Sequence, residues 1–290
     1  LFASSKSNKK NFTKFFVDKY VFPQTLKVME TRAIPHGIRI VTGDYDSIDF
    51  SEGYFGILLQ YPNSNGEIID YKKIIDSAKQ NGVYVVMAAD LLSLSILTPP
   101  GEMGADVAVG SSQRFGVPMG YGGPHAAYFA VKDEFKRIVP GRIIGMSIDA
   151  EGNNALRMAL QTREQHIRRE KATSNICTAQ VLLAIMAGMY AVYHGPEGIK
   201  KIGERIHALT NLLDRGLKEI GINQLNKTYF DTLKIQIEKD LLPTIKKEAE
   251  SKLINFRYDE NAIGISLHEA VKVSDIVEIL GLLSTCTKKK

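Results

Sequence analysis

Apolar runs alternate with amphipathic stretches along the first 130 residues of the chain. Short continuous apolar runs with turn residues on either side predict buried strands. The helical patterns between them cover residues 23–33, where Pro23 suits a first turn, and residues 70–80, which end at Asn81-Gly82. Buried strands that alternate with helices are typical of a mainly parallel sheet with helices on both faces. The runs that predict strands are residues 15–17, 38–41, 56–61, 83–88, 107–109 and 126–131.

The pattern changes in the last third of the chain. Residues 176–218 have the pattern of one or two long helices, interrupted near Gly195. The segments that follow predict strand, helix, strand, strand and helix, which is typical of a small α+β domain. We expect a boundary near residues 195–205, with a large domain over residues 1–200 and a small domain over residues 201–290. The predicted segments are residues 232–237, 242–251, 253–256, 262–267 and 273–283.

Composition excludes several classes of protein. The 290 residues are 44% hydrophobic and 24% charged, which is typical of a globular protein and not of a disordered chain or a collagen. Two cysteines are too few for a disulfide-stabilised scaffold or a zinc site. So few cysteines favour a reducing compartment, which is the cytoplasm or, in a eukaryote, the mitochondrial matrix. The longest apolar run, residues 181–193, is too short for a membrane helix. The net charge of +5 concentrates at the chain ends without interleaved aromatic residues, so we expect no nucleic-acid and no membrane partner.

A Gly-rich segment, GSSQRFGVPMGYGGPH, spans residues 110–125 between two predicted strands. Its glycines permit close approach of a ligand, although a crossover loop without a ligand explains them equally well. It matches neither a P-loop nor a dinucleotide fingerprint. Asp90 follows the predicted strand 83–88. A carboxylate at this position holds a ring nitrogen or a metal-bound water, or caps a following helix.

A second segment, QTREQHIRREKATSNICT, spans residues 161–178 and is rich in basic residues. Thr173, Ser174 and Asn175 stand just before a predicted helix, where hydroxyl, amide and free backbone N–H groups suit a phosphate. Simple capping of the helix by Ser174 or Asn175 is the alternative. His166 is more typical of a structural hydrogen-bonding residue than of a base. The histidines do not cluster and no GxSxG motif is present, so nothing favours a metal site or a serine nucleophile.

These two segments resemble the N-terminal half of the P-proteins of the glycine cleavage system, the glycine decarboxylase family. The segments DLLSLSILTPPGEMGAD and INFRYDENAIGISL resemble it too, and the similarity runs from about residue 11 to residue 283. The resemblance implies the fold-type-I architecture of pyridoxal-phosphate enzymes, with an incomplete large domain whose start precedes Leu1. It also implies decarboxylation of glycine, with transfer of the aminomethyl group to the lipoyl arm of the H-protein.

The resemblance implies particular roles for a few residues. The family carries its Schiff-base lysine only in the second half, in a His-Lys-Thr-Phe loop, and Gln113 stands at the matching position here. A glutamine amide forms no imine, so we expect no catalytic residue in this half and pyridoxal phosphate only in the parent enzyme. Asp90 matches the position that holds the pyridine nitrogen. The segment from Thr173 to Asn175 resembles one that reaches the cofactor phosphate of a neighbouring subunit.

We therefore expect a scaffold and interface role for this chain. The expected partners are a catalytic second half or subunit, the lipoylated H-protein and glycine, and the expected assembly is a homodimer. Two alternatives remain at the level of sequence. One is a stand-alone pyridoxal-phosphate enzyme that uses Lys171, whose basic neighbours would lower its pKa. The other is a binding module with no enzymatic role.

Overall fold

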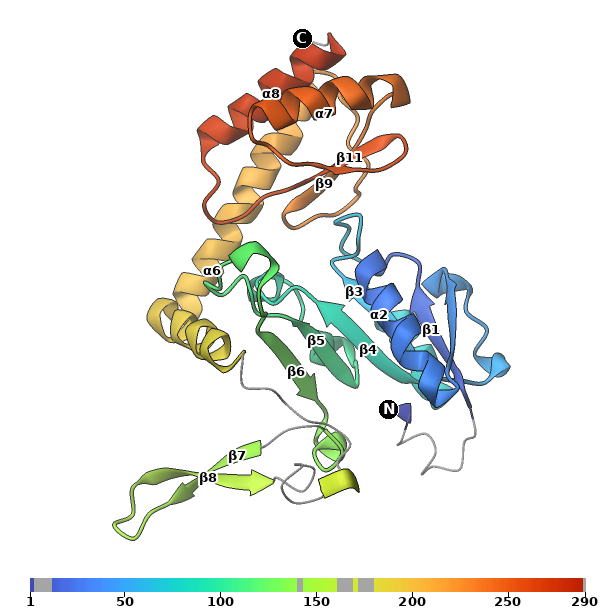
Figure 1. The fold of residues 1–290 in the computed structure, drawn as a ribbon, viewed down its shortest axis with the longest axis vertical. Coiled ribbons are helices and arrows are strands. Elements are labelled where there is room, and N and C mark those ends of the chain that lie inside the picture. Colours follow the sequence, from blue (N-terminus) through green and yellow to red (C-terminus); the bar gives the residue numbers. More distant parts are fainter. Residues whose placement is uncertain (3–11, 140–142, 161–168, 172–179, 289–290) are drawn as a thin grey trace.

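The computed structural model describes residues 1–2, 12–139, 143–160, 169–171 and 180–288. A six-stranded sheet forms the large domain, and a small domain lies beyond its carboxyl edge (Figure 1). The strand order is β2-β1-β3-β4-β5-β6; the first five of these strands are parallel, and β6 is antiparallel to β5. All six predicted strands lie in this one sheet, which confirms the α/β prediction. The strands are β1 (Lys14–Asp18), β2 (Arg39–Gly43), β3 (Tyr54–Tyr61), β4 (Tyr84–Ala89), β5 (Val107–Ser111) and β6 (Ala127–Val131).

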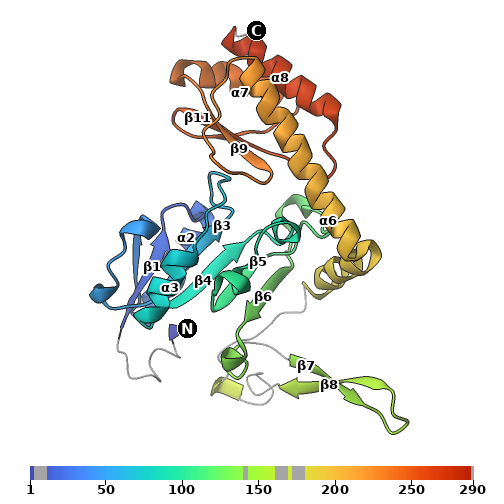
Figure 2. The same cartoon turned by 180° about the vertical axis from the view of Figure 1, so that it is seen from behind.

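Helices cover both faces of this sheet (Figure 1 and Figure 2). The helices are α2 (Pro23–Ala33), α3 (Lys72–Gln80) and the short α4 (Pro100–Met103). Strand β3 is buried at every residue because it packs on two sides. Leu58 belongs to a cluster that includes Leu26 of α2, while Leu59 belongs to a cluster that includes Ile75 of α3. Burial on both faces explains why the strand is a continuous apolar run.

A hairpin that the sequence pattern did not predict extends away from the sheet (Figure 1). It consists of β7 (Ile143–Ile148) and β8 (Asn154–Leu160), which pair antiparallel. Alternate residues of a strand share a face, so Ile144, Met146 and Ile148 project together, and all three are exposed. Within the described residues, the apolar face of the hairpin is therefore turned toward solvent instead of toward a core.

The long helix α6 (Val181–Glu219) leads from the large to the small domain (Figure 1). It bends at Gly195, with φ 62° and ψ 176°, just before Pro196, which confirms the predicted interruption. Before the bend, Tyr190 stacks on Phe115 of the large domain; after it, Ile206 is fully buried in the small-domain core. We propose on this basis that the domain boundary lies near residue 200. Within the described parts of the chain, no helix is long and apolar enough to cross a membrane.

The small domain is a three-stranded antiparallel sheet that packs against helices, as predicted. Its strands are β9 (Thr232–Gln236), β10 (Arg257–Tyr258) and β11 (Ala262–Ser266), and its helices are α7 (Leu242–Ser251), α8 (Val273–Thr287) and the second half of α6. The strand expected at residues 253–256 is wrong, because pairing begins only at Arg257. Leu253 instead takes a positive φ of 59° and is exposed, since the chain turns there as it leaves α7.

Candidate functional site

The carboxyl ends of β4 and β5 lie side by side at the sheet edge that faces the small domain. Asp90 directly follows β4, and its backbone N–H donates to the carbonyl of Tyr61 at 2.9 Å. Gly110 of β5 brings the two strands close, because a Cβ there would lie 2.2 Å from the carbonyl oxygen of Ala89. Arg114 lies in the turn after β5, which closes with a hydrogen bond from Phe115. The sheet therefore places Asp90 and the start of the Gly-rich segment together, as parallel strand ends require.

Arg114 joins two carboxylates from different domains. Its Nη1 lies 2.7 Å from Oδ2 of Asp90 and also forms an ion pair with Oδ2 of Asp231, which directly precedes β9. The guanidinium carbon lies 5.6 Å from the ring centre of Phe230, a cation–π distance. We call Asp90, Arg114 and Asp231 the Arg114 cluster. It links the edge of the large sheet to the first strand of the small domain.

Burial and neighbouring charges compete in setting the pKa values of the Arg114 cluster. Burial is the main cause that raises the pKa of Asp90. The positive charge of Arg114 lowers this pKa, and the negative charge of Asp231 raises it further. Burial by itself lowers the pKa of Arg114, but the charges of Asp90 and Asp231 outweigh it, so this pKa is raised. The guanidinium therefore stays charged and serves two carboxylates at once.

A second contact joins the domains at the turn after β3. Asn65 accepts hydrogen bonds from two small-domain side chains, Nδ2 of Asn226 at 2.7 Å and Nζ of Lys234 at 3.1 Å. Arg257 donates to the carbonyl of Ser64 in the same turn. Gly66 follows, with φ 84°, so close to Thr232 that a Cβ would lie 2.5 Å from its carbonyl oxygen. The turn therefore fits the small domain only with a glycine at this position.

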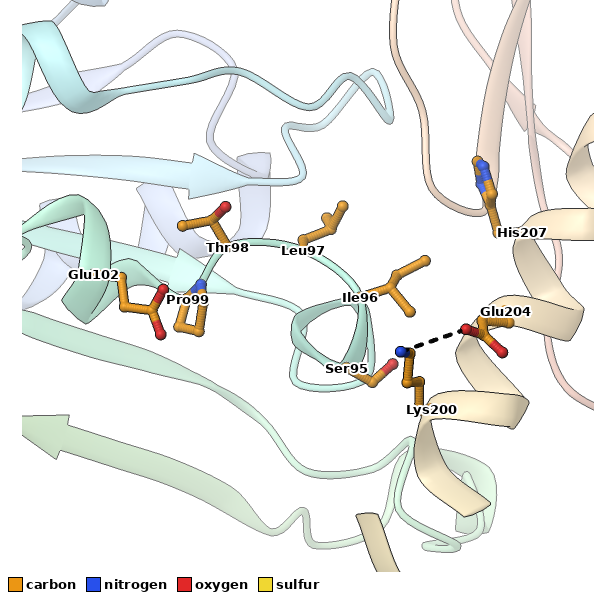
Figure 3. Close-up of a pocket in the computed structure, with 9 residues that line it drawn as sticks. All are labelled: Ser95, Ile96, Leu97, Thr98, Pro99, Glu102, Lys200, Glu204 and His207. Atoms are coloured by element: carbon orange, nitrogen blue, oxygen red, sulfur yellow. Dashed lines mark ion pairs between the residues drawn. The ribbon is translucent and has the colours of Figure 1, made fainter. Parts of the chain in front are cut away.

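A cavity of about 600 Å³ lies between α6 and the segment that follows Asp90 (Figure 3). Lys200 and Glu204 face it from α6, with 3.8 Å between their charged atoms. His207 also lines it, and its Nδ1 lies 3.0 Å from the carbonyl oxygen of Phe230. The sequence reasoning missed this cavity, because its two walls are about 100 positions apart and only the i, i+4 spacing on α6 is visible locally. The lining is Ser95, Ile96, Leu97, Thr98, Pro99, Glu102, Lys200, Glu204 and His207.

Several residues that the sequence singled out have no described environment. Thr173, Ser174 and Asn175 lie outside the described residues, and so does His166. Lys171 ends a short 3₁₀ helix (Arg169–Lys171), and its side chain is not among those described. Among the described residues, no group of three or more His, Cys, Asp or Glu side chains is placed to hold a metal ion. Of the proposed cofactor-binding residues, the structure therefore describes Asp90 alone.

The sheet and its small domain have the architecture of fold type I, the fold of pyridoxal-phosphate-dependent enzymes. A NifS-like protein shares this fold at a TM-score of 0.65 and 14% identity, over 98% of this chain and 77% of that one. The family model described as "Glycine cleavage system P-protein" matches residues 1–283, and the chain belongs to this family. The crystal structure of glycine decarboxylase, the P-protein of the glycine cleavage system, in an inhibitor-bound form superposes with a TM-score of 0.84 at 28% identity, over 96% of this chain and 67% of that one.

Two bacterial relatives extend the comparison. Glycine dehydrogenase (decarboxylating) from Nostoc punctiforme is 55% identical over 271 residues, which is 93% of this chain and 28% of the relative. The protein of the same name from Flavobacterium johnsoniae is 54% identical over 288 residues, or 99% of this chain and 30% of the relative. The chain therefore spans less than a third of the length of these relatives.

The residues at this sheet edge do not fit pyridoxal phosphate. Gln113, where the resemblance leads us to expect the family's lysine, offers an amide and no amine, and its backbone N–H donates to Oγ of Ser111 at 3.1 Å. The carboxylate of Asp90, expected to meet the ring nitrogen, already holds the guanidinium of Arg114. Among the described residues at this sheet edge, Gln113 therefore offers no amine for a covalent anchor, and the carboxylate of Asp90 is already paired.

Proposed function

We propose that this chain is the non-catalytic first half of a glycine decarboxylase. The parent enzyme uses pyridoxal phosphate to decarboxylate glycine and passes the aminomethyl group to the lipoyl arm of the H-protein. The observation that carries the proposal is Gln113, which stands in the turn after β5 in a chain of the P-protein family. The bacterial sources of the relatives support a cytoplasmic location.

The role proposed for this half is to contact a catalytic half or subunit and a second copy of the assembly. The apolar face of the hairpin supports this role, because Met146 and its cross-strand partner Leu156 are 71% and 77% exposed. The first turns of α6 add exposed Val181, Ile185 and Val192. Contiguous exposed apolar surface usually marks a protein interface.

Thr173 and Asn175 are proposed to reach the cofactor phosphate held by the neighbouring half. The sequence supports this, because it predicts a helix from about residue 176, and hydroxyl and amide groups before a helix start suit an anion. In the full-length parent, Thr173→Ala and Asn175→Ala should each weaken pyridoxal phosphate binding in an absorbance titration. If both variants bind pyridoxal phosphate with unchanged affinity, the segment does not contact the phosphate and serves only to cap a helix.

Release of labelled CO₂ from carboxyl-labelled glycine tests the function as a whole. The chain with pyridoxal phosphate and lipoylated H-protein should release none, and adding the catalytic half of a relative should restore release. Failure of the mixture when the two chains form a stable complex would contradict the proposal.

The stand-alone alternative gives a different result. Borohydride reduction of the chain with pyridoxal phosphate would then leave a pyridoxyl group on one specific lysine, with Lys171 the residue to watch in peptide mass mapping. We expect no such site-specific adduct, because Gln113 occupies the position of the family's lysine.

A further inference from the structure

We propose that Arg114 holds the two domains of this half in one fixed arrangement and also blocks the carboxylate of Asp90 from any ligand ring. We call this role of Arg114 the clasp. The part that concerns the cofactor ring rests on the proposed function; the mechanical part rests on the Arg114 cluster alone. Asp90 and Asp231 are 141 positions apart and belong to different domains, yet both meet the same nitrogen of Arg114.

The small-domain end of the clasp is held in a fixed orientation. The second oxygen of Asp231, Oδ1, accepts a hydrogen bond from Oγ1 of Thr232 at 2.8 Å, so the carboxylate cannot swing freely. Phe230 lies beneath the guanidinium and is fully buried in the small-domain core. Its carbonyl oxygen lies 3.0 Å from Nδ1 of His207 on α6. Through Asp231 and Phe230, Arg114 is therefore connected to the core of the small domain.

The large-domain end is equally well fixed. Oδ1 of Asp90 accepts from the backbone N–H of Leu92 at 3.3 Å, which leaves Oδ2 for Arg114. Each carboxylate therefore uses one oxygen to fix its own orientation and the other to hold the guanidinium. A cationic ring nitrogen at Asp90 would have to displace Arg114, and the guanidinium would keep only Asp231 in a partly buried site. Removing one partner of such a group is costly, so the ion pair excludes the ring.

Hydrogen exchange measured by mass spectrometry tests the clasp in the purified chain. Arg114→Met should raise the exchange rate by about tenfold or more in peptides covering residues 228–235 and 90–95, the scale expected for loss of a charged hydrogen bond. Peptides from β1 and α8 should keep their rates, which shows that the variant remains folded. The matched control is Arg32→Met, which removes an exposed arginine on α2 and should leave all four regions unchanged.

A double-mutant cycle makes the test specific for the pair. Asp231→Asn keeps the shape of the side chain and should raise exchange at residues 228–235 less than Arg114→Met does. The combination of both changes should be no worse than Arg114→Met, since the pair is already broken. Unchanged exchange in Arg114→Met, or effects that simply add in the combination, would overturn the clasp. Release of CO₂ by the chain alone would overturn the proposed function and leave this exchange result standing.

Discussion

At the scale of single residues, Asp18 has an unusual environment. It ends β1 with 1% of its surface exposed. Burial is the main cause that raises its pKa from 3.8 to about 6, and the nearby negative charge of Asp44 adds to it. A carboxyl group in this position costs free energy when it is charged.

We expect the pH dependence of stability to identify Asp18. Between pH 3.8 and about 6, the folded chain keeps a proton that the unfolded chain releases. The free energy of unfolding therefore falls as the pH rises through this window, and the loss is complete above it. Asp18→Asn carries no such proton, so its stability relative to the wild type should increase between about pH 4 and about pH 7.5 in urea titrations.

The control for this prediction is Asp240→Asn, which changes an exposed carboxylate. Its stability relative to the wild type should stay the same over the pH range. A constant difference for Asp18→Asn as well would show that the buried carboxyl group does not titrate as described.

At the scale of elements, the β7–β8 hairpin is exposed on the face that carries Met146 and Leu156. We expect the chain to self-associate through this apolar face. Met146→Lys together with Leu156→Lys should shift light scattering toward the monomer over a concentration series, because charged side chains disfavour burial. The free energy of unfolding should change by only about 0.5 kcal/mol, as is usual for exposed positions.

Ser147→Lys serves as the matched control, since Ser147 lies on the opposite face of the same strand. It should leave association unchanged. A wild-type chain that stays monomeric at high concentration, or equal effects on both faces, would contradict the proposed interface.

The same hairpin shows where sequence reasoning ends. The central strands were predictable, because burial on both faces turns β3 into an uninterrupted apolar run. The hairpin was not, since its apolar residues serve no core within the described chain. The β10 error has a local cause, because the apolar residues at 253–256 complete a turn after α7 instead of pairing. The local hydrophobic pattern of a segment indicates whether its side chains are buried. It therefore predicts strands wrongly where burial and strand pairing do not coincide.

The candidate site likewise has one part that could be predicted from the sequence and one part that could not. Asp90 and Arg114 follow adjacent parallel strands of a sheet that the sequence pattern predicts, so their proximity is a consequence of the strand order. Asp231 was missed, because its approach depends on how a separate domain docks, and no local pattern encodes that geometry. The same holds for the cavity beside His207, whose two walls belong to different domains.

At the scale of the whole molecule, the two domains meet at the Arg114 cluster and at the turn that ends with Gly66. We expect Gly66→Ala to disturb this second contact. The positive φ of 84° costs an alanine about 1 kcal/mol, and the overlap with Thr232 adds to it. Urea unfolding should therefore show a loss of more than about 1 kcal/mol, together with faster hydrogen exchange at residues 63–68.

Gly281→Ala provides a control of opposite sign. Gly281 lies on the exposed side of α8, where no atom is within 4 Å of the added Cβ. Alanine favours a helix over glycine by about 1 kcal/mol, so this variant should be more stable than the wild type. If both variants change stability alike, the turn does not depend on glycine for its fit against the small domain.

The strand order of the large sheet has a consequence for how the protein is made. After β1 and β2 have paired, β3 adds beside β1, and each later strand adds beside the one synthesised just before it. Among these six described strands, growth after the first pair proceeds at a single edge in the direction of translation, so none of them waits for a much later neighbour within this set. Short separations between neighbours also keep the entropy cost of each closure low. The Arg114 cluster is the exception, because it forms only after Asp231 has been synthesised. The attachment of the small domain is therefore a late step in the folding of the chain during its synthesis.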